Sequence, residues 1–199
     1  MNGRSVILAV EDTLSEAVST KILASLGIDI SQRLGLKGKG YLQSKAPSLN
    51  QTAKGFPVFM LTDQDAPSQC PPQLVQDWTK GERHARFFLR VAVMEVESWI
   101  MADRRGFADF LSIPFNRIPE DTDVILRPKE FLVSLARLSK KTRLRQEIVP
   151  PPGATSKVGP AYNSRLGEFV HSRWSVNLAA AVSVSLQRTL AQLRNFNSV

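Results

Sequence analysis

Three short, largely apolar runs, separated by longer stretches with other patterns, constrain the fold of this chain more than any other feature. The runs cover residues 5–10, 56–62 and 86–94. A continuous apolar run of this length, without polar alternation, is typical of a strand buried on both faces. Strands that alternate with helices predict a parallel-rich central sheet flanked by helices, so the expected fold class is α/β.

The segments between these runs carry helix and turn signals. Thr13 and Glu16 fit a capping box, which predicts a helix with Thr13 as its N-cap. A further strand is expected at residues 28–33. Weaker helical patterns follow at residues 41–53 and from Pro72 onward.

The pattern changes beyond Ser112, where helical periodicity replaces the strand-like runs. A helix is expected at residues 128–138. One long C-terminal helix is expected to bury a stripe made of Trp174, Leu178, Val182, Leu186, Leu190 and Leu193. We therefore predict an α/β core at residues 1–112 and a helical C-terminal extension, residues 113–199, packed on that core.

The charge of the chain favours anionic partners. Its 199 residues carry a formal net charge of +8, with a sequence pI near 10.0. Such a surplus promotes binding to anions through counterion release and steering without fixing which anion, and a nucleic-acid or nucleotide partner is expected. A protein that is merely basic is the alternative. The hydrophobic content of 43% argues against disorder of the whole chain.

Cysteine usage and hydropathy indicate the compartment. Cys70 is the only cysteine, so no intramolecular disulfide and no multi-cysteine zinc site can form. The apolar stretches fall short of the roughly 20 residues that span a bilayer, and the N-terminus does not resemble a signal peptide. We therefore expect a cytoplasmic protein with no membrane partner.

Acidic residues follow each of the three apolar runs. Glu11 follows the first, Asp63 and Asp65 the second, and Glu95 and Glu97 the third. In open α/β sheets, ligands bind outside the carboxyl ends of the strands. Carboxylates that converge there suit Mg²⁺ or Mn²⁺, so these residues are candidate metal ligands. An ordinary polar turn at the second run is the alternative.

The two-residue spacing of Asp63 and Asp65 places both side chains on one side of an extended segment. Two carboxylates that close repel each other and perturb each other's pKa values. A cation between them relieves that repulsion. On a phosphodiester, the same cation can activate water and stabilise the developing charge.

These acids, taken together, resemble the TOPRIM arrangement of topoisomerases, bacterial primases and OLD-family nucleases. The resemblance is carried by Glu11 at the first strand end, the Asp-Gln-Asp motif at residues 63–65 and a further acid downstream. It implies a TOPRIM-like fold in which Glu11 acts as general acid/base and Asp63 and Asp65 bind Mg²⁺. TOPRIM proteins commonly have Gly after the first Glu, whereas this chain has Asp12.

A closer resemblance, covering most of the chain, is to an uncharacterised TOPRIM-related family of bacterial proteins found in defence loci beside ATPase genes. It is carried by residues 91–103, 159–163 and 169–174 in that order. It implies an effector subunit of an anti-phage system and a partner ATPase. A homo-oligomer is left open.

The choice between Glu95 and Glu97 as the third metal ligand is also left open, with Glu97 ranked slightly higher. Glu97 shares a helical face with Met101. It also starts a helix, where an acid gains from the dipole in any case.

Several basic residues are candidates for holding a phosphate backbone. Small residues around the lysines in two loops let backbone N–H groups approach a phosphate while a lysine neutralises it. A third group forms a cluster that gives affinity without sequence information. Plain solvated loops and surfaces are the alternatives. The candidates are Lys37, Lys39, Lys140, Lys141, Arg143 and Lys157.

The leading hypothesis is a divalent-metal-dependent nuclease that uses Mg²⁺ or Mn²⁺, with Glu11, Asp63, Asp65 and Glu97 as its catalytic residues. The alternative is a non-catalytic, TOPRIM-like binding or regulatory subunit of an ATPase complex. A nucleotidyl-transfer or primase-like activity is a third reading, and no separate nucleotide-binding motif supports it.

Overall fold

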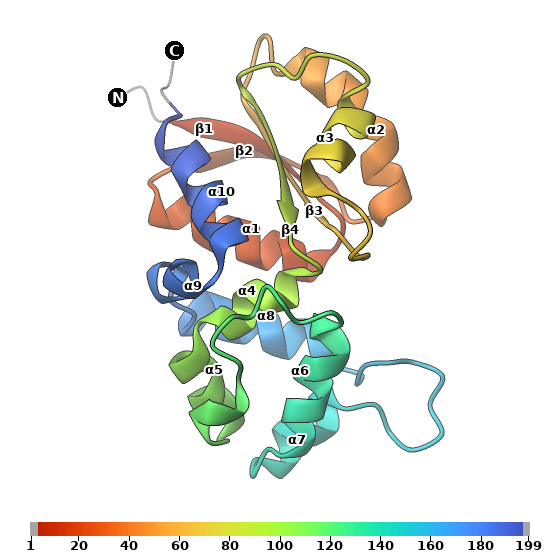
Figure 1. The fold of residues 1–199 in the computed structure, drawn as a ribbon, viewed down its shortest axis with the longest axis vertical. Coiled ribbons are helices and arrows are strands. Elements are labelled where there is room, and N and C mark those ends of the chain that lie inside the picture. The colour runs from red at the N-terminus through yellow and green to blue at the C-terminus, as the bar shows by residue number, and fades with distance from the viewer. Residues whose placement is uncertain (1–3, 197–199) are drawn as a thin grey trace.

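A four-stranded, all-parallel sheet lies at the centre of the molecule (Figure 1). The computed structural model describes residues 4–196. Helices flank the sheet, so the predicted α/β class with a parallel central sheet is confirmed. The strands, in the spatial order β2-β1-β3-β4, are β1 (Ser5–Val10), β2 (Asp29–Gly35), β3 (Val58–Asp63) and β4 (Phe87–Ala92).

Ten α-helices and one 3₁₀ helix complete the described part of the chain. They are α1 (Thr13–Ser25), α2 (Lys39–Thr52), α3 (Pro71–Thr79), α4 (Val96–Ala102), α5 (Arg104–Leu111), η1 (Phe115–Arg117), α6 (Pro128–Arg137), α7 (Thr142–Ile148), α8 (Tyr162–Ser172), α9 (Val176–Val182) and α10 (Val184–Arg194). No helix among residues 4–196 combines the length and the hydropathy needed to cross a membrane.

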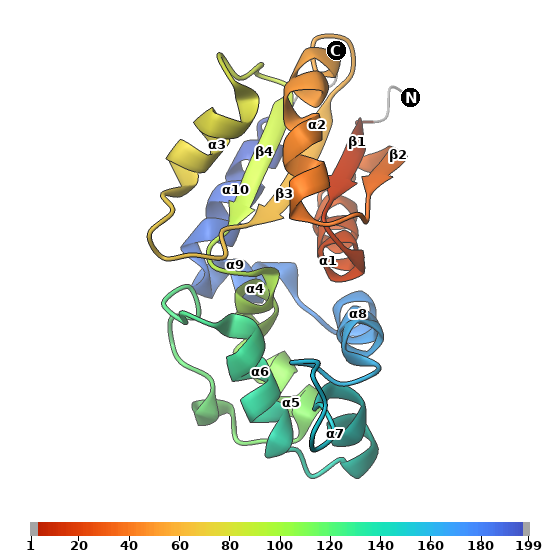
Figure 2. The same ribbon diagram turned by 90° about the vertical axis from the view of Figure 1, so that its right-hand side faces the viewer.

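Helices cover both faces of the sheet, as the continuous apolar runs require. Val6 and Leu8 of β1 belong to a core shared with α1 and α10, whereas Ile7 and Ala9 belong to a second core shared with α2 and α3. Figure 2 shows these helix pairs on opposite sides of the strands. The remaining helices, α4 to α9, gather beyond the carboxyl ends of the strands (Figure 1).

The strand order creates a topological switch point between β1 and β3. The chain leaves β1 in one direction to form β2, then crosses back over β1 to form β3. In open α/β sheets the crevice for ligands lies at such a point, outside the carboxyl ends of the strands. Gly35 keeps β2 close there: a Cβ on it would lie 1.9 Å from the carbonyl oxygen of Val10, and its φ is +109°.

The C-terminal helices return to the sheet. In the described chain, α8 packs on α1, α9 on α4 and α10 on β4. The division of the chain at residue 112 stays a prediction.

Two local predictions are wrong. The N-cap of α1 is Asp12 and not Thr13, because the Asp12 carboxylate accepts the N–H of Ser15 at 2.8 Å. The C-terminal helix is two helices, since Ser183 interrupts it and caps α10 by accepting the N–H of Leu186. The first of them, α9, buries Val176 and Ala179, so Leu178 of the predicted buried stripe is exposed.

Candidate functional site

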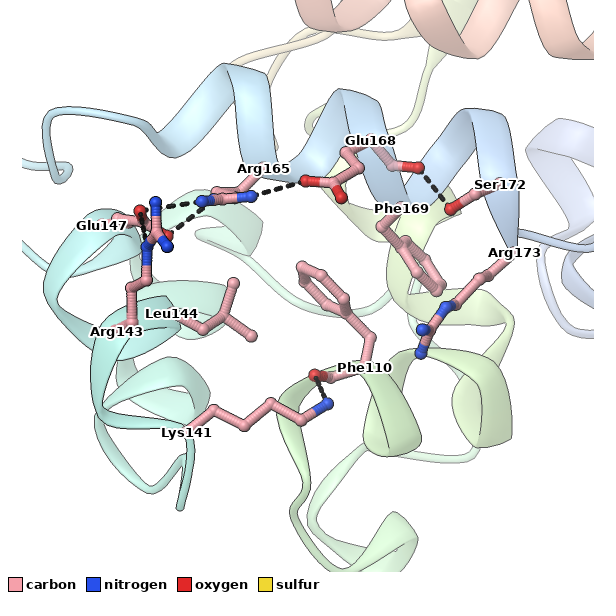
Figure 3. Close-up of a pocket in the computed structure, with 10 residues that line it drawn as sticks. All are labelled: Phe110, Lys141, Arg143, Leu144, Glu147, Arg165, Glu168, Phe169, Ser172 and Arg173. Carbon is pink, nitrogen blue, oxygen red and sulfur yellow. Dashed lines mark hydrogen bonds and ion pairs between the residues drawn. The ribbon is translucent and has the colours of Figure 1, made fainter.

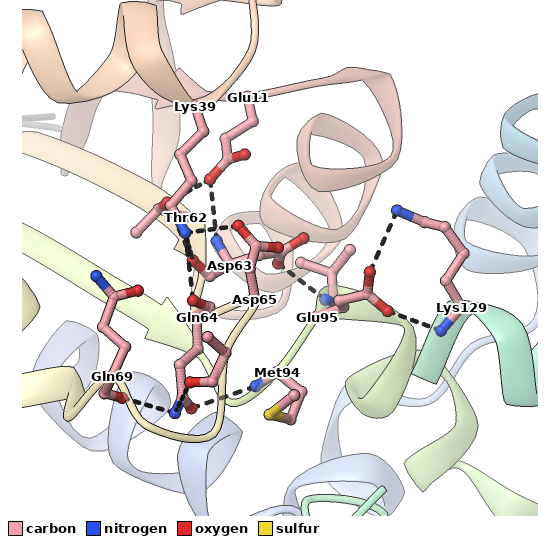
Figure 4. Close-up of polar contacts among 12 residues, drawn as sticks. Glu11, Lys39, Thr62, Asp63, Gln64, Asp65, Gln69, Met94, Glu95 and Lys129 are labelled. Carbon is pink, nitrogen blue, oxygen red and sulfur yellow. Dashed lines mark hydrogen bonds and ion pairs between the residues drawn. The ribbon is translucent and has the colours of Figure 1, made fainter. Parts of the chain in front are cut away.

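Glu11 and Asp63 meet at the switch point between β1 and β3. One carboxylate oxygen of Glu11, Oε1, accepts the backbone N–H of Asp63 at 3.0 Å and also the hydroxyl of Thr62 (Figure 4). Burial raises the pKa of Glu11, although these two hydrogen bonds oppose the shift. The first and second apolar runs therefore bring their acids together, although the two residues lie 52 positions apart.

Asp63 is held against the start of α4. Its Oδ1 accepts the N–H of Val96 at 2.9 Å, and only 8% of the residue is exposed. Burial raises the pKa of Asp63 well above its ordinary value, and the neighbouring charges of Glu97 and Glu11 raise it further. Three carboxylates from the three strand ends thus lie in one another's field.

Glu97 is the most deeply buried of these acids, with 1% of it exposed. Its Oε1 accepts the hydroxyl of Tyr162 at 3.0 Å. Its other oxygen, Oε2, is buried and has no hydrogen-bond partner in the described chain. Burial raises the pKa of Glu97 to about 7, the charge of Lys129 opposes that shift, and Glu95 adds to it. A buried carboxylate oxygen without a partner is unusual and indicates a missing ligand or proton.

Lys129, at the first turn of α6, supplies a positive charge to the same acids. Its ammonium lies 3.5 Å from Glu95 Oε1 and 3.6 Å from Glu97 Oε1, and its backbone N–H donates to Glu95 Oε2 at 2.7 Å (Figure 4). Burial alone would lower the pKa of Lys129, but Glu97 and Glu95 raise it above its ordinary value. Glu95 is thereby engaged by Lys129 with both oxygens, whereas Glu97 keeps one oxygen free.

Asp65 does not lie beside Asp63 in the predicted manner. Its φ is +67°, so the backbone leaves the extended conformation after β3, and the argument from an extended two-residue spacing is wrong. Its carboxylate pairs instead with Lys39, whose ammonium lies 2.6 Å from Asp65 Oδ2 and also donates to the carbonyl of Asp63 at 2.8 Å (Figure 4). Lys39, at the start of α2, therefore binds the turn that follows β3 and does not project from a flexible loop as predicted.

The donor chemistry of this site fits a hard divalent cation. Among residues 4–196, no group of three or more His, Cys, Asp or Glu side chains is arranged around a single ion position. Mg²⁺, however, keeps several waters and is commonly held by one or two carboxylates together with substrate phosphates. Asp63, with its raised pKa, and Glu97, with its unpartnered Oε2, supply such a pair.

A pocket of about 340 Å³ opens beside these acids. Asp65 and Glu95 line it from the sheet side, and Arg127, Lys129 and Lys157 contribute cations. Glu130 also lines the pocket and lies 3.3 Å from Arg127 and 3.1 Å from Lys157. Both pairs are largely exposed, so these contacts are weak. The pocket places positive charge next to the carboxylates, as the binding of a phosphate beside a metal requires.

The other predicted phosphate-binding residues lie elsewhere. Lys37 is exposed and lies over the ring of Tyr41, 5.1 Å from its centroid. Lys140 is exposed at the start of the basic cluster. Lys141 and Arg143 line a separate pocket of about 530 Å³ between α5, α7 and α8 (Figure 3).

In that second pocket the basic residues are already engaged. Lys141 donates to the carbonyl of Phe110 at 2.8 Å, and Arg143 pairs with Glu147 at 3.1 Å (Figure 3). Glu147 also accepts two hydrogen bonds from Arg165. Arg143 is thus part of an ion-pair network between α7 and α8, whereas Lys141 is held by backbone carbonyls.

Sequence reasoning missed Lys129, Thr62 and Tyr162. Tyr162 lies within residues 159–163, which carry part of the family resemblance, but that resemblance assigns it no role; neither Lys129 nor Thr62 belongs to a recognisable motif. Tyr162 lies 65 positions from Glu97, and Lys129 follows a proline that signals only a helix start. Pairing of this kind depends on how the elements pack, so no local signal in the chain identifies it.

No protein-family model matches the chain, and no curated protein matches it. Among solved structures, the chain is similar to the C-terminal region of the Burkholderia pseudomallei OLD protein, at 18% sequence identity and a TM-score of 0.40. The match covers 84% of this chain and 97% of that chain. A likeness this distant assigns no activity, so the fold class rests on the chain's own parallel sheet and the function on the geometry of its site.

Proposed function

We propose that the chain is a divalent-metal-dependent nuclease that hydrolyses phosphodiester bonds in nucleic acid. The observation that carries the proposal is the pair of buried acids Asp63, at the end of β3, and Glu97, on α4. Both have raised pKa values, and Oε2 of Glu97 is unpartnered. Acids in this state need a cation or a proton, and perturbed acids in a cleft indicate a functional site.

The residues divide into three roles in this proposal. Asp63 and Glu97 would hold Mg²⁺ or Mn²⁺, which supplies Lewis acidity and lowers the pKa of water when bound. Glu11 would accept the proton of the attacking water, because burial raises its pKa toward the working range of a base. Arg127 and Lys157 would hold the phosphate from the pocket beside the acids.

Asp65 and Lys39 have a supporting role in the proposal. Their ion pair at 2.6 Å shapes the turn after β3, and Lys39 fixes the carbonyl of Asp63. The ion pair with Lys39 engages only Oδ2 of Asp65, so a role for Asp65 as a direct metal ligand would fall to its other oxygen, Oδ1.

The cellular setting is proposed from the resemblance alone. The TOPRIM-related family implies an effector of an anti-phage system that works with a partner ATPase. Regulation by such a partner would keep the isolated chain latent.

The first test is cleavage of plasmid DNA, single-stranded DNA and total tRNA by the purified chain with Mg²⁺, Mn²⁺ or EDTA. Metal-dependent cutting that is lost in both Asp63→Asn and Glu97→Gln supports the proposal. A melting temperature that rises with metal in the wild type, but not in these variants, supports the metal site even if the chain is latent. Absence of both effects would reject the nuclease.

One observation favours a second function, a non-catalytic binding or regulatory subunit. Lys39 and Lys129 already lie against the acids, so the chain neutralises part of its own carboxylate charge. In that case the acids would serve stability. Substitution of Asp63 would then leave binding intact, and metal would not change the melting temperature.

A further inference from the structure

A second feature of the sheet is a groove of about 470 Å³ along its outer strand, β4. Residues of β4 line the groove, α3 contributes one wall and α10 the other. Leu89 and Val91 give it an apolar lining, together with Val75 and Pro72 of α3. We call this feature the arginine groove, because Arg83, Arg90 and Arg188 also line it.

The three arginines lie in one another's field. The pKa of Arg90 is lowered to about 10, first by burial and then by the charges of Arg83 and Arg188. The only side-chain hydrogen bond of Arg90 in the described chain is to the hydroxyl of Thr189, at 3.3 Å. Within residues 4–196, none of the three forms an ion pair with a carboxylate.

Some arginines elsewhere in the chain, by contrast, have a carboxylate partner. Arg33 pairs with Glu16, Arg143 with Glu147, and Arg165 with Glu168. Arg90 is partly buried beside two further arginines and has no carboxylate partner in the described chain, an arrangement that costs stability. Such an arrangement is therefore expected where a ligand supplies the opposite charge.

The linings of the groove and of the pocket beside the acids follow one another along the chain. The groove lining extends along β4 to Val93, which is followed by Met94 and then Glu95 in the pocket beside the carboxylates. A guanidinium matches a phosphate with two parallel hydrogen bonds. The apolar residues between the arginines suit the less polar sugars and bases of a nucleic-acid strand.

We propose that the arginine groove binds the phosphodiester backbone of a single nucleic-acid strand and guides it along β4 to the acidic site. This inference deepens the proposed function and rests on it for the identity of the ligand. Arg83 and Arg188, both exposed, contact phosphates directly. Arg90, which is less exposed, anchors the middle of the path.

The test is binding without cleavage. Fluorescence anisotropy follows a labelled single-stranded oligothymidylate with the full chain in EDTA, over a series of salt concentrations. We expect Arg83→Ser/Arg188→Ser to raise Kd at least roughly tenfold, because hydrogen bonds to charged groups contribute well over 1 kcal/mol each. The slope of log K against log salt should fall by about 0.7 for each lost phosphate contact.

The matched control is Arg117→Ser/Arg137→Ser, which removes the same charge from two exposed arginines that donate no side-chain hydrogen bond in the described chain. Its Kd should change less than about threefold, which is the effect expected when two positive charges are removed without the loss of a specific contact. Circular dichroism melting of each variant verifies that it folds. An equal loss in both double variants, or no loss in the groove variant, would overturn the proposal.

A competing polyglutamate peptide separates nucleic acid from an acidic protein segment, which could instead add to the outer edge of β4. If the peptide displaces the oligonucleotide as well as unlabelled oligothymidylate does, the groove is a peptide site and the proposal is wrong. If the groove variant loses oligonucleotide binding, and the wild-type chain does not cut whichever metal is added, the nuclease is rejected and the groove is kept. If cutting requires Asp63 but the groove variant binds the oligonucleotide as well as the wild type does, the nuclease is kept and the groove is rejected.

Discussion

The acidic site at the switch point and the arginine groove along β4 both gather like charges, but they resolve the repulsion differently. In the acidic site, Lys39 and Lys129 lie against the carboxylates and compensate part of their charge. In the arginine groove, no carboxylate of the described chain forms an ion pair with Arg83, Arg90 or Arg188. The first site therefore keeps much of its charge balance within the chain, whereas the second depends on a ligand.

The charge that each site leaves uncompensated indicates which kind of ligand the site would bind. Glu97 combines burial, a raised pKa and an unpartnered oxygen in spite of its nearby lysine. The internal counterions of the acidic site are thus incomplete, which leaves a place for a metal. The groove has no internal counterion, so its ligand must be an anion. The acidic site lacks a cation and the groove lacks an anion. A single polyanionic substrate that lies in the groove and contacts a metal at the acids would supply both.

The largest expected effect is on cleavage. Asp63→Asn should lower the metal-dependent cleavage rate at least about 100-fold, because it weakens the transition-state charge stabilisation that a metal at Asp63 would supply. The amide can still accept the N–H of Val96, so the fold should persist. A gel assay on single-stranded DNA measures the rate. Asp77→Asn, which alters an exposed acid on α3, is the control and should cut normally.

The pH dependence of stability should be the next largest effect. The folded pKa of Glu97, about 7, exceeds its unfolded value near 4.5, so the folded state binds more protons between these values. The free energy of unfolding of the metal-free chain should therefore fall as pH rises from about 4.5 to 7, by on the order of 2–3 kcal/mol. Urea unfolding in EDTA at several pH values measures it.

Glu97→Gln provides the comparison for that pH series. It removes the titrating group and keeps an acceptor for the hydroxyl of Tyr162. Its profile should be flatter than that of the wild type. A wild-type profile that is already flat over this range would show that Glu97 ionises normally.

A smaller effect is expected from the internal counterion. Lys129→Met should destabilise the metal-free chain at pH 8 by about 1–2 kcal/mol, since it leaves Glu95 and buried Glu97 without their cation. The figure is below that for a fully buried pair because the Lys129 side chain is 35% exposed. Excess Mg²⁺ should restore part of the loss if the ion replaces the ammonium.

Lys157→Met is the matched variant, because Lys157 belongs to an exposed pair with Glu130. It should change stability by less than about 0.5 kcal/mol. Thermal melts with and without Mg²⁺ compare the two. Equal destabilisation by both substitutions would contradict a special role for Lys129.

The smallest expected effect is a gain in stability at the arginine groove. Arg83→Ser/Arg188→Ser should stabilise the free protein by about 0.5 kcal/mol at low salt, since it relieves repulsion on Arg90. The gain should shrink at high salt, because exposed charges are screened. Chemical denaturation at two salt concentrations measures it. A loss of stability would mean that these arginines are paired in solution.

Some of this protein could be predicted from the sequence because the signals are local. The apolar runs located β1, β3 and β4, and the acids were placed correctly at their carboxyl ends. Burial on both faces requires continuous apolar runs, so the pattern itself predicts a sheet covered by helices. The candidate acids Glu11 and Asp63 followed from the rule that ligands bind at that edge.

Other features required the tertiary structure. The turn of Asp65 toward Lys39, the break at Ser183 and the contacts of Tyr162 and Lys129 with Glu97 join residues with no shared motif. The arginine groove likewise joins residues from β4, α10 and the segment before β4. The sequence by itself determined where the strands of the sheet form and which edge carries the acids, because apolar runs and periodicity are properties of each segment. Only the tertiary structure decided which charges face one another, because electrostatic pairing depends on the strand order and on helix packing between distant parts of the chain.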